Sequence, residues 1–461
     1  MIFFLLVLLC TYHFEKSRGS YNHSAYHASK LSVEDQYVLQ THKYKESIPL
    51  VSSRSDILRH DRLHRDYVHE LIIAIRLRNM EELTKSLHDV SDPNNGLYGH
   101  HLTRDEVVNL TSNFDSCAAV TDYLRKNDAS VVSQTLGGEY ITATATVAVW
   151  ERMFNTKFFV FHQTHFEEEV EELVRAEEYW IPNELHEHVD AVLNIIEMPI
   201  LSRRGTRNRS AAKSLIGNRK LIGVLIPDTV TPALLRAVYN MGDSQGSDLS
   251  TQAVFANGNN YFNPLNLAYF QQNISMQPLQ AAISIGSHNT TDNKLDCAEG
   301  NLGLQYIMSM SPGSPTTFWH WRFSLGRWLR DISNSAIVPL VLSVSYGGTE
   351  SSVSIGEHEL FTAKAIILGA MGVTIVIASG DMGAADTQNS LWPTCRYNPD
   401  FPSVNPYVVS VGATQVRCAQ YGVRLFVLNK VLPYSAPSEL LCMSCCRDLR
   451  AANLKSCASR K

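Results

Sequence analysis

Two apolar runs decide the fold of this chain: VPLVLSVSYG at residues 338–347 and VTIVIASGD at residues 373–381. Both are rich in Val, Ile and Leu, which is typical of parallel strands that are buried on two faces. The residues between them show helical spacing through five apolar side chains: Leu360, Ala363, Ile366, Ile367 and Ala370. This pattern stops at Gly372, so the order predicts a strand, a helix and a parallel strand. In such sheets the chemistry gathers at the carboxyl ends of the strands, where Asp381 lies.

Three blocks of this region resemble consecutive segments of the sedolisin family of serine-carboxyl peptidases (peptidase S53): SVSYGGTE at 343–350, ASGDMGA at 378–384 and FPSVNPYVVSVGAT at 401–414. An earlier segment, VSDPNNGLYGHHLTRDEV at 90–107, resembles the inhibitory propeptide of that family. The resemblance begins near residue 60 and fails after about residue 415. It implies an α/β subtilisin-like catalytic domain with a parallel sheet, C-terminally truncated, preceded by an α+β inhibitory propeptide domain.

Composition describes an ordinary globular protein, with 44% hydrophobic residues, 18% charged residues and a net charge of −5. The negative charge argues against a nucleic-acid partner. The apolar run at residues 2–10 is too short to span a bilayer, and no later run approaches the ~20 residues that a membrane helix needs. We therefore expect a cleaved signal peptide and no membrane span. The alternative is a wrongly defined chain start, because the basic n-region of a signal peptide is missing.

Five Asn-x-Ser/Thr sequons favour a glycosylated product that is lysosomal or secreted: Asn22, Asn109, Asn208, Asn273 and Asn289. Single sequons also arise by chance. The cysteines crowd into the end of the chain, where Cys442, Cys445, Cys446 and Cys457 make half of a zinc-like pattern without a paired second half, so no metal site is predicted.

Changes of pattern along the chain predict its segments. Apolar residues at helical spacing predict a helix over residues 69–87, within a small α+β domain. A basic stretch without apolar periodicity predicts an exposed linker, which favours cleavage of a zymogen, although an uncleaved tether is the alternative. The predicted segments are a signal peptide at 1–19, a polar N-terminal segment at 20–56, a propeptide (pro-kumamolisin-like) domain at 57–201, a basic linker with the activation site at 202–220, a partial peptidase domain at 221–415 and a divergent Cys-rich tail at 416–461.

Histidines are concentrated in the N-terminal part, because 14 of the 17 lie before residue 200. Histidine gains charge just below neutral pH, so acidification is expected to charge the propeptide segment and loosen its contact with the catalytic domain. Surface histidines without a switching role are the alternative.

The resemblance implies a serine nucleophile, a Glu general base supported by an Asp, and a second Asp that stabilises the oxyanion. A Glu whose pKa is near ~4.3 is an ionised base in acid, where an imidazole would be protonated. The oxyanion Asp must be protonated to donate its hydrogen bond, which also favours acid conditions. The implied activity is proteolysis at acid pH of peptides or unfolded proteins, by release of N-terminal tripeptides. Spacing does not decide between exopeptidase and endopeptidase action.

The block AEGNLGLQYIMS at 298–309 resembles the helix that carries the family's Glu and identifies Glu299 as the base. The supporting Asp stands four residues later in the family, on the same helix face, but here that position is Gly303. Asp292 and Asp296 have the same spacing but precede the matched block, so they are interpreted as loop carboxylates. An exposed helical Glu is the structural alternative for Glu299.

The block ASGDMGA identifies Asp381 as the oxyanion residue, with a strand-ending turn Asp as the alternative. Ser345, Tyr346 and Gly347 are expected to present backbone groups to an extended peptide substrate, although a tight turn would also explain them.

The nucleophile of the family stands in a Gly-Thr-Ser motif, which does not occur in these 461 residues. The Ca²⁺ expected for the family would also bind in the region without a counterpart here. The chain as written is therefore predicted to be inactive, with a poorly stable catalytic domain because its parallel strands lack cover. The alternative function is a non-catalytic relative that binds peptides or inhibits a full-length peptidase.

Overall fold

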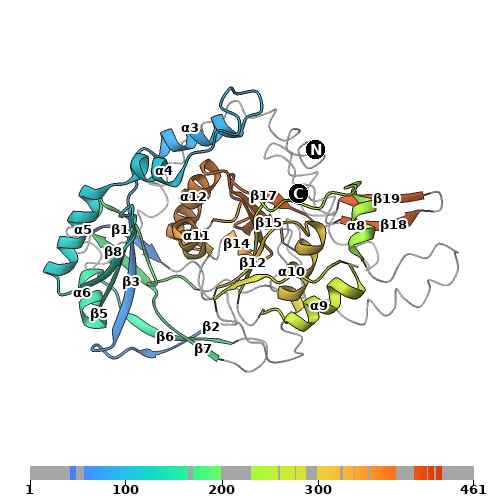
Figure 1. Ribbon diagram of the computed structural model, residues 1–461. Coiled ribbons are helices and arrows are strands. Elements are labelled where there is room, and N and C mark those ends of the chain that lie inside the picture. The colour runs from blue at the N-terminus through green and yellow to red at the C-terminus, as the bar shows by residue number, and fades with distance from the viewer. Residues whose placement is uncertain are drawn as a thin grey trace, which may run out of the picture.

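Two sheets of different character organise the chain, an antiparallel one in the N-terminal part and a parallel one in the C-terminal part (Figure 1). This agrees with the predicted α+β domain followed by an α/β domain. The computed structural model describes residues 42–47, 57–164, 170–198, 230–257, 260–275, 277–286, 298–321, 325–336, 338–350, 353–380, 399–412, 414–419 and 422–427. The predicted signal peptide, the basic linker and the four tail cysteines named above lie outside these residues.

The N-terminal sheet has the strand order β4-β5-β3-β9 and is antiparallel throughout. Its strands are β3 (Val68–Ile75), β4 (Ser130–Gln134), β5 (Tyr140–Thr146) and β9 (Val189–Leu193). Two smaller sheets flank it, β2-β6-β7 and β1-β8, formed by β1 (His42–Ser47), β2 (Ile57–Arg62), β6 (Phe158–Thr164), β7 (Val170–Ala176) and β8 (Glu178–Pro182).

The helix predicted over residues 69–87 is wrong in its first half, because residues 68–75 form the central strand β3. The segment ends in a run of β-branched Ile residues, which favour a strand. Asn79 then adopts a left-handed conformation, with φ of 52°, and α3 (Met80–Ser91) follows. The other helices of this part are α4 (Arg104–Thr111), α5 (Phe114–Lys126) and α6 (Val147–Met153).

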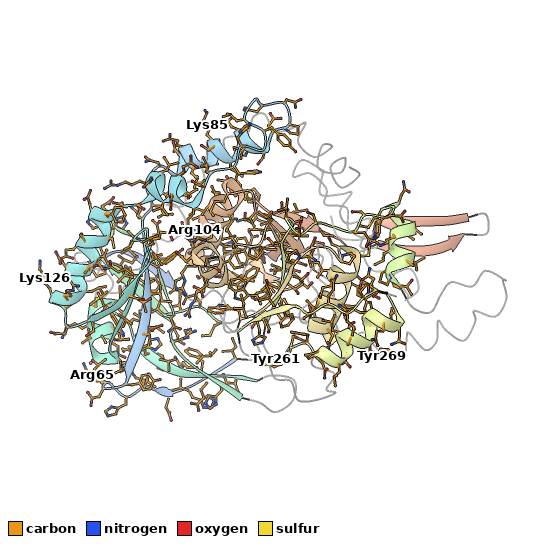
Figure 2. All side chains as sticks on the ribbon, viewed as in Figure 1. Arg65, Lys85, Arg104, Lys126, Tyr261 and Tyr269 are labelled. Carbon is orange, nitrogen blue, oxygen red and sulfur yellow. The ribbon has the colours of Figure 1, made fainter. Side chains whose placement is uncertain are left out.

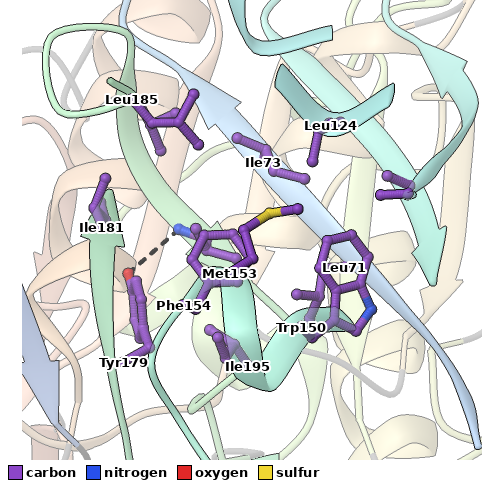
Figure 3. Packing of buried hydrophobic residues seen from close by; sticks show 14 of the residues in the cluster. Leu71, Ile73, Leu124, Trp150, Met153, Phe154, Tyr179, Ile181, Leu185 and Ile195 are labelled. Atoms are coloured by element: carbon purple, nitrogen blue, oxygen red, sulfur yellow. Dashed lines mark hydrogen bonds between the residues drawn. The ribbon is translucent and has the colours of Figure 1, made fainter. Parts of the chain in front are cut away.

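The core of the N-terminal domain lies between the sheet and the helices α5 and α6 (Figure 3). Trp150 and Phe154 are fully buried there and stack at 6.0 Å between ring centroids. The polar atoms of the two fully buried polar aromatic residues in this core are paired: Trp150 Nε1 donates to the carbonyl of His69, and the Tyr179 hydroxyl accepts from the amide of Val192 at 3.3 Å. This satisfies the rule that buried polar groups need partners.

The C-terminal sheet has the order β11-β12-β10-β13-β15-β17, and all its pairs are parallel. Its strands are β10 (Gln252–Ala256), β11 (Ile283–Ile285), β12 (Thr316–His320), β13 (Val341–Val344), β15 (Thr374–Ala378) and β17 (Val409–Val411). Short antiparallel pairs join β14 (Gly348–Thr349) to β16 (Asp400–Phe401) and β18 (Thr414–Ala419) to β19 (Gly422–Val427).

The predicted strand-helix-strand unit is confirmed as β13, α12 (Ile355–Ala370) and β15. The helix begins before the first apolar position of the pattern because the Ser354 hydroxyl accepts a hydrogen bond from the amide of Glu357 and caps it. Gly372, with φ of 89°, lies just beyond the helix end, a conformation that favours glycine.

Helices cover the two faces of the parallel sheet unevenly. On one face, α8 (Pro232–Val238), α9 (Pro264–Asn273) and α10 (Ala298–Met310) gather at the β11-β12-β10 side, while α11 (Leu325–Asn334) and α12 cover the other face. Thr374 and Ala378 of β15 are therefore exposed and Val376 is half-buried, whereas Ile375 and Ile377 are buried. The strand β15 is thus buried on one face and partly open on the other, because no described helix packs over that half of the first face. This agrees with the expectation that the parallel strands lack part of their cover.

Two neighbouring crossovers of this sheet have opposite hands. The chain passes from β11 through α10 to β12 and then through α11 to β13, crossing the sheet in the same direction both times. Since α10 and α11 lie on opposite faces, one of the two connections has the rare left-handed sense. This topology places the first turn of α10 at the carboxyl edge of the sheet.

The helix α12 lies between the two domains (Figure 1). Its residue Leu360 packs against β3, β5 and β9, and its last two turns pack against α3 and α4. The amide of Leu102 also donates to the carbonyl of Ala370 at 2.9 Å. The N-terminal domain is thus docked on the helical layer of the parallel sheet.

Candidate functional site

The carboxyl edge of the parallel sheet is the place where the predicted site residues can meet. The connection from β10 leads to β11 on one side, whereas the connection from β13 leads to β15 on the other. Adjacent strands whose connections diverge in this way form a topological switch point, at which ligands bind in open α/β sheets. The segment after β10 and residue Ser345 after β13 flank this point.

Glu299 lies in the first turn of α10, half-buried. The turn is held against the segment after β10, because the amide of Asn263 donates to Asn301 Oδ1 at 2.9 Å. Gly300 permits the close approach, since a Cβ there would lie 2.4 Å from the carbonyl oxygen of Tyr261. The predicted helix with Glu299 at its start is confirmed, while the role of Glu299 stays a prediction.

An aromatic pair lies beside this turn. The ring of Tyr261, labelled in Figure 2, stacks on the imidazole of His320 at 4.4 Å with an angle of 22°. His320 ends β12 and is buried. The close packing of β11 and β12 at this edge also requires Gly286, where a Cβ would lie 2.1 Å from the carbonyl oxygen of His320. Sequence analysis missed this histidine, whose only signal was its position at the end of an apolar run.

Ser345, Tyr346 and Gly347 follow β13 directly, while their presentation of backbone groups to a substrate stays a prediction. Ser345 is exposed, whereas Tyr346 is buried with its ring edge-on to Phe255, 5.2 Å between centroids. A Cβ at Gly347 would lie 2.8 Å from the carbonyl oxygen of Phe401. Glycine is needed here for close packing of two chain segments, a structural reason for this residue that differs from the tight turn given as the alternative.

The described parts of the three matched blocks meet at this edge. Residues 348–349 pair with residues 400–401, and β15, which ends at Ala378, pairs with β17. Gly380, with φ of 86°, approaches Asp400 so closely that a Cβ would lie 1.7 Å from Asp400 Oδ2. Asp381 itself lies outside the described residues, as do Asp292 and Asp296.

Two further polar residues, which sequence analysis did not identify, lie at the carboxyl edge of the sheet near Gly380 and Phe401. Asp400 adjoins the glycine that precedes Asp381, and its signal was its place directly before the third matched block. His358, in the first turn of α12, packs on Phe401 at 4.3 Å, and burial lowers the pKa of its imidazole. A hydrogen bond between His358 Nε2 and the carbonyl of Glu350 opposes that shift in part.

Gly303 lies one turn along α10 from Glu299, on the side that faces the sheet. A Cβ at this position would lie 3.2 Å from Val254 Cγ1, closer than ordinary van der Waals contact. The space beside Glu299 that a carboxylate partner would occupy is therefore narrowed by Val254.

The described residues contain no group of three or more His, Cys, Asp and Glu side chains that could hold a metal ion. The Ca²⁺ that the family resemblance implies therefore stays a prediction for a region outside these residues. None of the helices that the structure describes is long and apolar enough to cross a bilayer. Of the sequons, Asn109 in α4 and Asn273 at the end of α9 are exposed, which leaves room for a glycan, while Asn22, Asn208 and Asn289 lie outside the described part.

Residues 55–198 match the family model described as Pro-kumamolisin, activation domain. Tripeptidyl-peptidase 1 of Dictyostelium discoideum is 29% identical over 385 residues, covering 74% of this chain and 61% of that protein. Human tripeptidyl-peptidase 1 is 27% identical over 385 residues, covering 79% of this chain and 64% of that protein. The chain thus spans less than two thirds of the length of these relatives.

Among solved structures, Pseudomonas sedolisin, a serine-carboxyl proteinase complexed with pseudo-iodotyrostatin, aligns with 20% identity over 41% of this chain and 55% of that chain, with a TM-score of 0.33. The epidermin leader peptide processing serine protease of Staphylococcus aureus aligns with 10% identity over 76% of this chain and 71% of that chain, with a TM-score of 0.35. Neither likeness is close enough to support a functional argument.

Proposed function

Because the chain belongs to the sedolisin family of serine-carboxyl peptidases, we propose that it is the precursor form of an acid peptidase of the tripeptidyl-peptidase 1 type. Its substrates are peptides or unfolded proteins, from which the complete enzyme would release N-terminal tripeptides. The observation that carries the proposal is an activation-domain sequence, residues 55–198, docked through α12 on a parallel-sheet domain in the same chain.

In the proposed reaction Glu299 is the general base and Asp381 the oxyanion donor. The position of Glu299 supports this role. It lies at the start of α10, whose first turn is held beside the switch point of the sheet. A carboxylate there accepts a proton at acid pH, where a histidine would already be charged. Ser345 is the exposed residue after β13 that would meet the backbone of an extended peptide.

We further propose that the 461-residue chain by itself does not hydrolyse peptides. Gly303 removes the carboxylate that would orient Glu299, and no Gly-Thr-Ser motif supplies a nucleophile. Loss of an orienting or nucleophilic group commonly lowers turnover by several powers of ten.

Turnover of a peptide with a free N-terminus, followed by mass spectrometry at about pH 4 to 5, tests the proposal. A complete tripeptidyl peptidase is the positive control. The expected result is release of tripeptides by the control and none by the chain. Tripeptide release that disappears in Glu299→Gln would show that the chain is a competent enzyme and would overturn the assignment of Gly303 as inactivating.

The second candidate is a non-catalytic relative that binds peptides or inhibits a full-length peptidase. The same features favour it: Gly303 weakens catalysis while the docked N-terminal domain and the carboxyl edge of the sheet are kept. Adding the chain, with its linker intact, to the complete enzyme tests the inhibitory form of this candidate. Slower tripeptide release supports it, whereas an unchanged rate leaves peptide binding, which is measured directly with a labelled peptide.

The proposed location is the lysosome or the exterior of the cell, supported by the exposed sequons Asn109 and Asn273. A shift in gel mobility after treatment with a glycosidase tests it, and the variants Asn109→Gln and Asn273→Gln would identify which sites are used.

A further inference from the structure

Within the part of the chain that the structure describes, the interface between the two domains contains a buried ion pair. Lys364 Nζ, in the middle of α12, donates to Glu139 Oε2 at 2.9 Å, and the two residues are 225 positions apart in the chain. The side chains are 0% and 9% exposed. Lysine and glutamate are almost never buried to this extent unless they are paired.

Apolar contacts enclose the pair along α12. Leu360, one turn before Lys364, packs into β3, β5 and β9, and Ile367, one turn after it, packs on α3 and α4. Lys364 Nζ also lies 4.8 Å from the centroid of the Tyr140 ring and makes a cation–π contact with it. Tyr140 is the residue after Glu139 and begins β5. Water is therefore kept away from both charges.

A buried ion pair of this kind contributes more to the specificity of domain docking than to its free energy. Removing two charges from water costs about as much as their mutual attraction returns, so replacing a buried pair by apolar residues is often neutral. Removing or reversing one member leaves an unpaired buried charge, for which the penalty is large. A docking partner without a carboxylate at the position of Glu139 would thus be rejected.

We propose that the Glu139–Lys364 pair is the specificity determinant by which the parallel-sheet domain accepts its own N-terminal domain and excludes related domains that lack the matching charge. The inference rests on the proposed function only in treating residues 55–198 as a propeptide. The partner that α12 recognises is a domain with a carboxylate at the position of Glu139, next to an apolar sheet face.

The test uses the full chain with a site-specific protease sequence placed within the predicted linker, residues 202–220. After cleavage at neutral pH, gel filtration and a dilution series measure how tightly the N-terminal domain stays associated. Glu139→Gln, Glu139→Lys and Lys364→Glu are each expected to weaken association by ~100-fold or more, whereas the double reversal is expected to restore it to within about tenfold. The apolar pair Glu139→Met with Lys364→Met should also associate to within about tenfold.

The matched control is the exposed pair Arg59–Glu177, joined at 2.9 Å with both side chains 50% exposed. Its single reversals should change association by less than about fivefold. Hydrogen exchange in β5 and β13 checks that each domain of every variant is folded. Single reversals that leave association unchanged, or a folded double reversal that remains dissociated, would overturn the proposal. Association is measured without turnover, so a failure to cleave peptides bears on the proposed function alone.

Discussion

Acidification should destabilise the N-terminal domain through His69. The imidazole is buried, its Nε2 donates to the carbonyl of Asn194 at 2.9 Å, and its ring packs edge-on to Phe158. Burial lowers the pKa of His69 from 6.5 to about 4, against the opposing hydrogen bond and with a smaller contribution from the positive charges of Arg175 and Arg327. His69 is thus a buried member of the histidine-rich segment, while the predicted charging of that segment in acid stays a prediction.

The magnitude follows from linkage between protonation and folding. The pKa of His69 is lower in the folded state, so the unfolded state binds the proton first and stability falls as pH drops from 6.5 towards 4. The full effect is about 3 kcal/mol, of which about 2 kcal/mol is lost by pH 5. Below about pH 4 both states are protonated and this residue causes no further loss.

Hydrogen exchange of the β3 amides in the full chain measures this loss, after correction for the pH dependence of intrinsic exchange. Between neutral pH and pH 5 the protection of β3 should fall about 30-fold, and His69→Gln, which keeps a donor, should remove most of that change. The matched control is His60→Gln, at an exposed imidazole, which should leave the change intact. An equal loss of protection in the unaltered chain and in His69→Gln would refute the reasoning.

Three further predictions concern packing and capping. Trp150→Ala removes a fully buried ring (Figure 3) and should destabilise the N-terminal domain by about 3 to 5 kcal/mol in urea unfolding. Glu357→Gln weakens the carboxylate that accepts from the amide of Gly326 at 2.7 Å and should lower the stability of the parallel-sheet domain by ~1 kcal/mol in thermal unfolding. Gly369→Val places a Cβ 2.9 Å from Leu87 Cδ1, so hydrogen exchange in α3 should accelerate while that in β5 stays unchanged.

Local patterns predicted the elements whose signals were unambiguous. The unit β13-α12-β15 has two apolar runs of strand length and a segment of helix length that ends at Gly372. The length of each segment and the spacing of its apolar residues therefore predicted the same element. Residues 69–75 were predicted as part of a helix because a short apolar run fits both periods. Pairing of this segment with β5 and β9 makes it a strand.

The parts of the site that sequence analysis missed depend on contacts between distant segments. Asp400 reaches Gly380 because β16 pairs with β14, which follows β13, the neighbour of β15. His320 meets Tyr261 because β10 and β12 are neighbours. The Glu139–Lys364 pair joins two domains and has no local signal at all.

We propose that the chain is a zymogen whose N-terminal domain is held at neutral pH and released in acid. The most direct measurement is analytical ultracentrifugation of the folded chain, cleaved once in the predicted linker, at neutral pH and at about pH 4 to 5. One sedimenting complex is expected at neutral pH and two separate domains in acid. Domains that stay together in acid, or that are already apart at neutral pH, would contradict it.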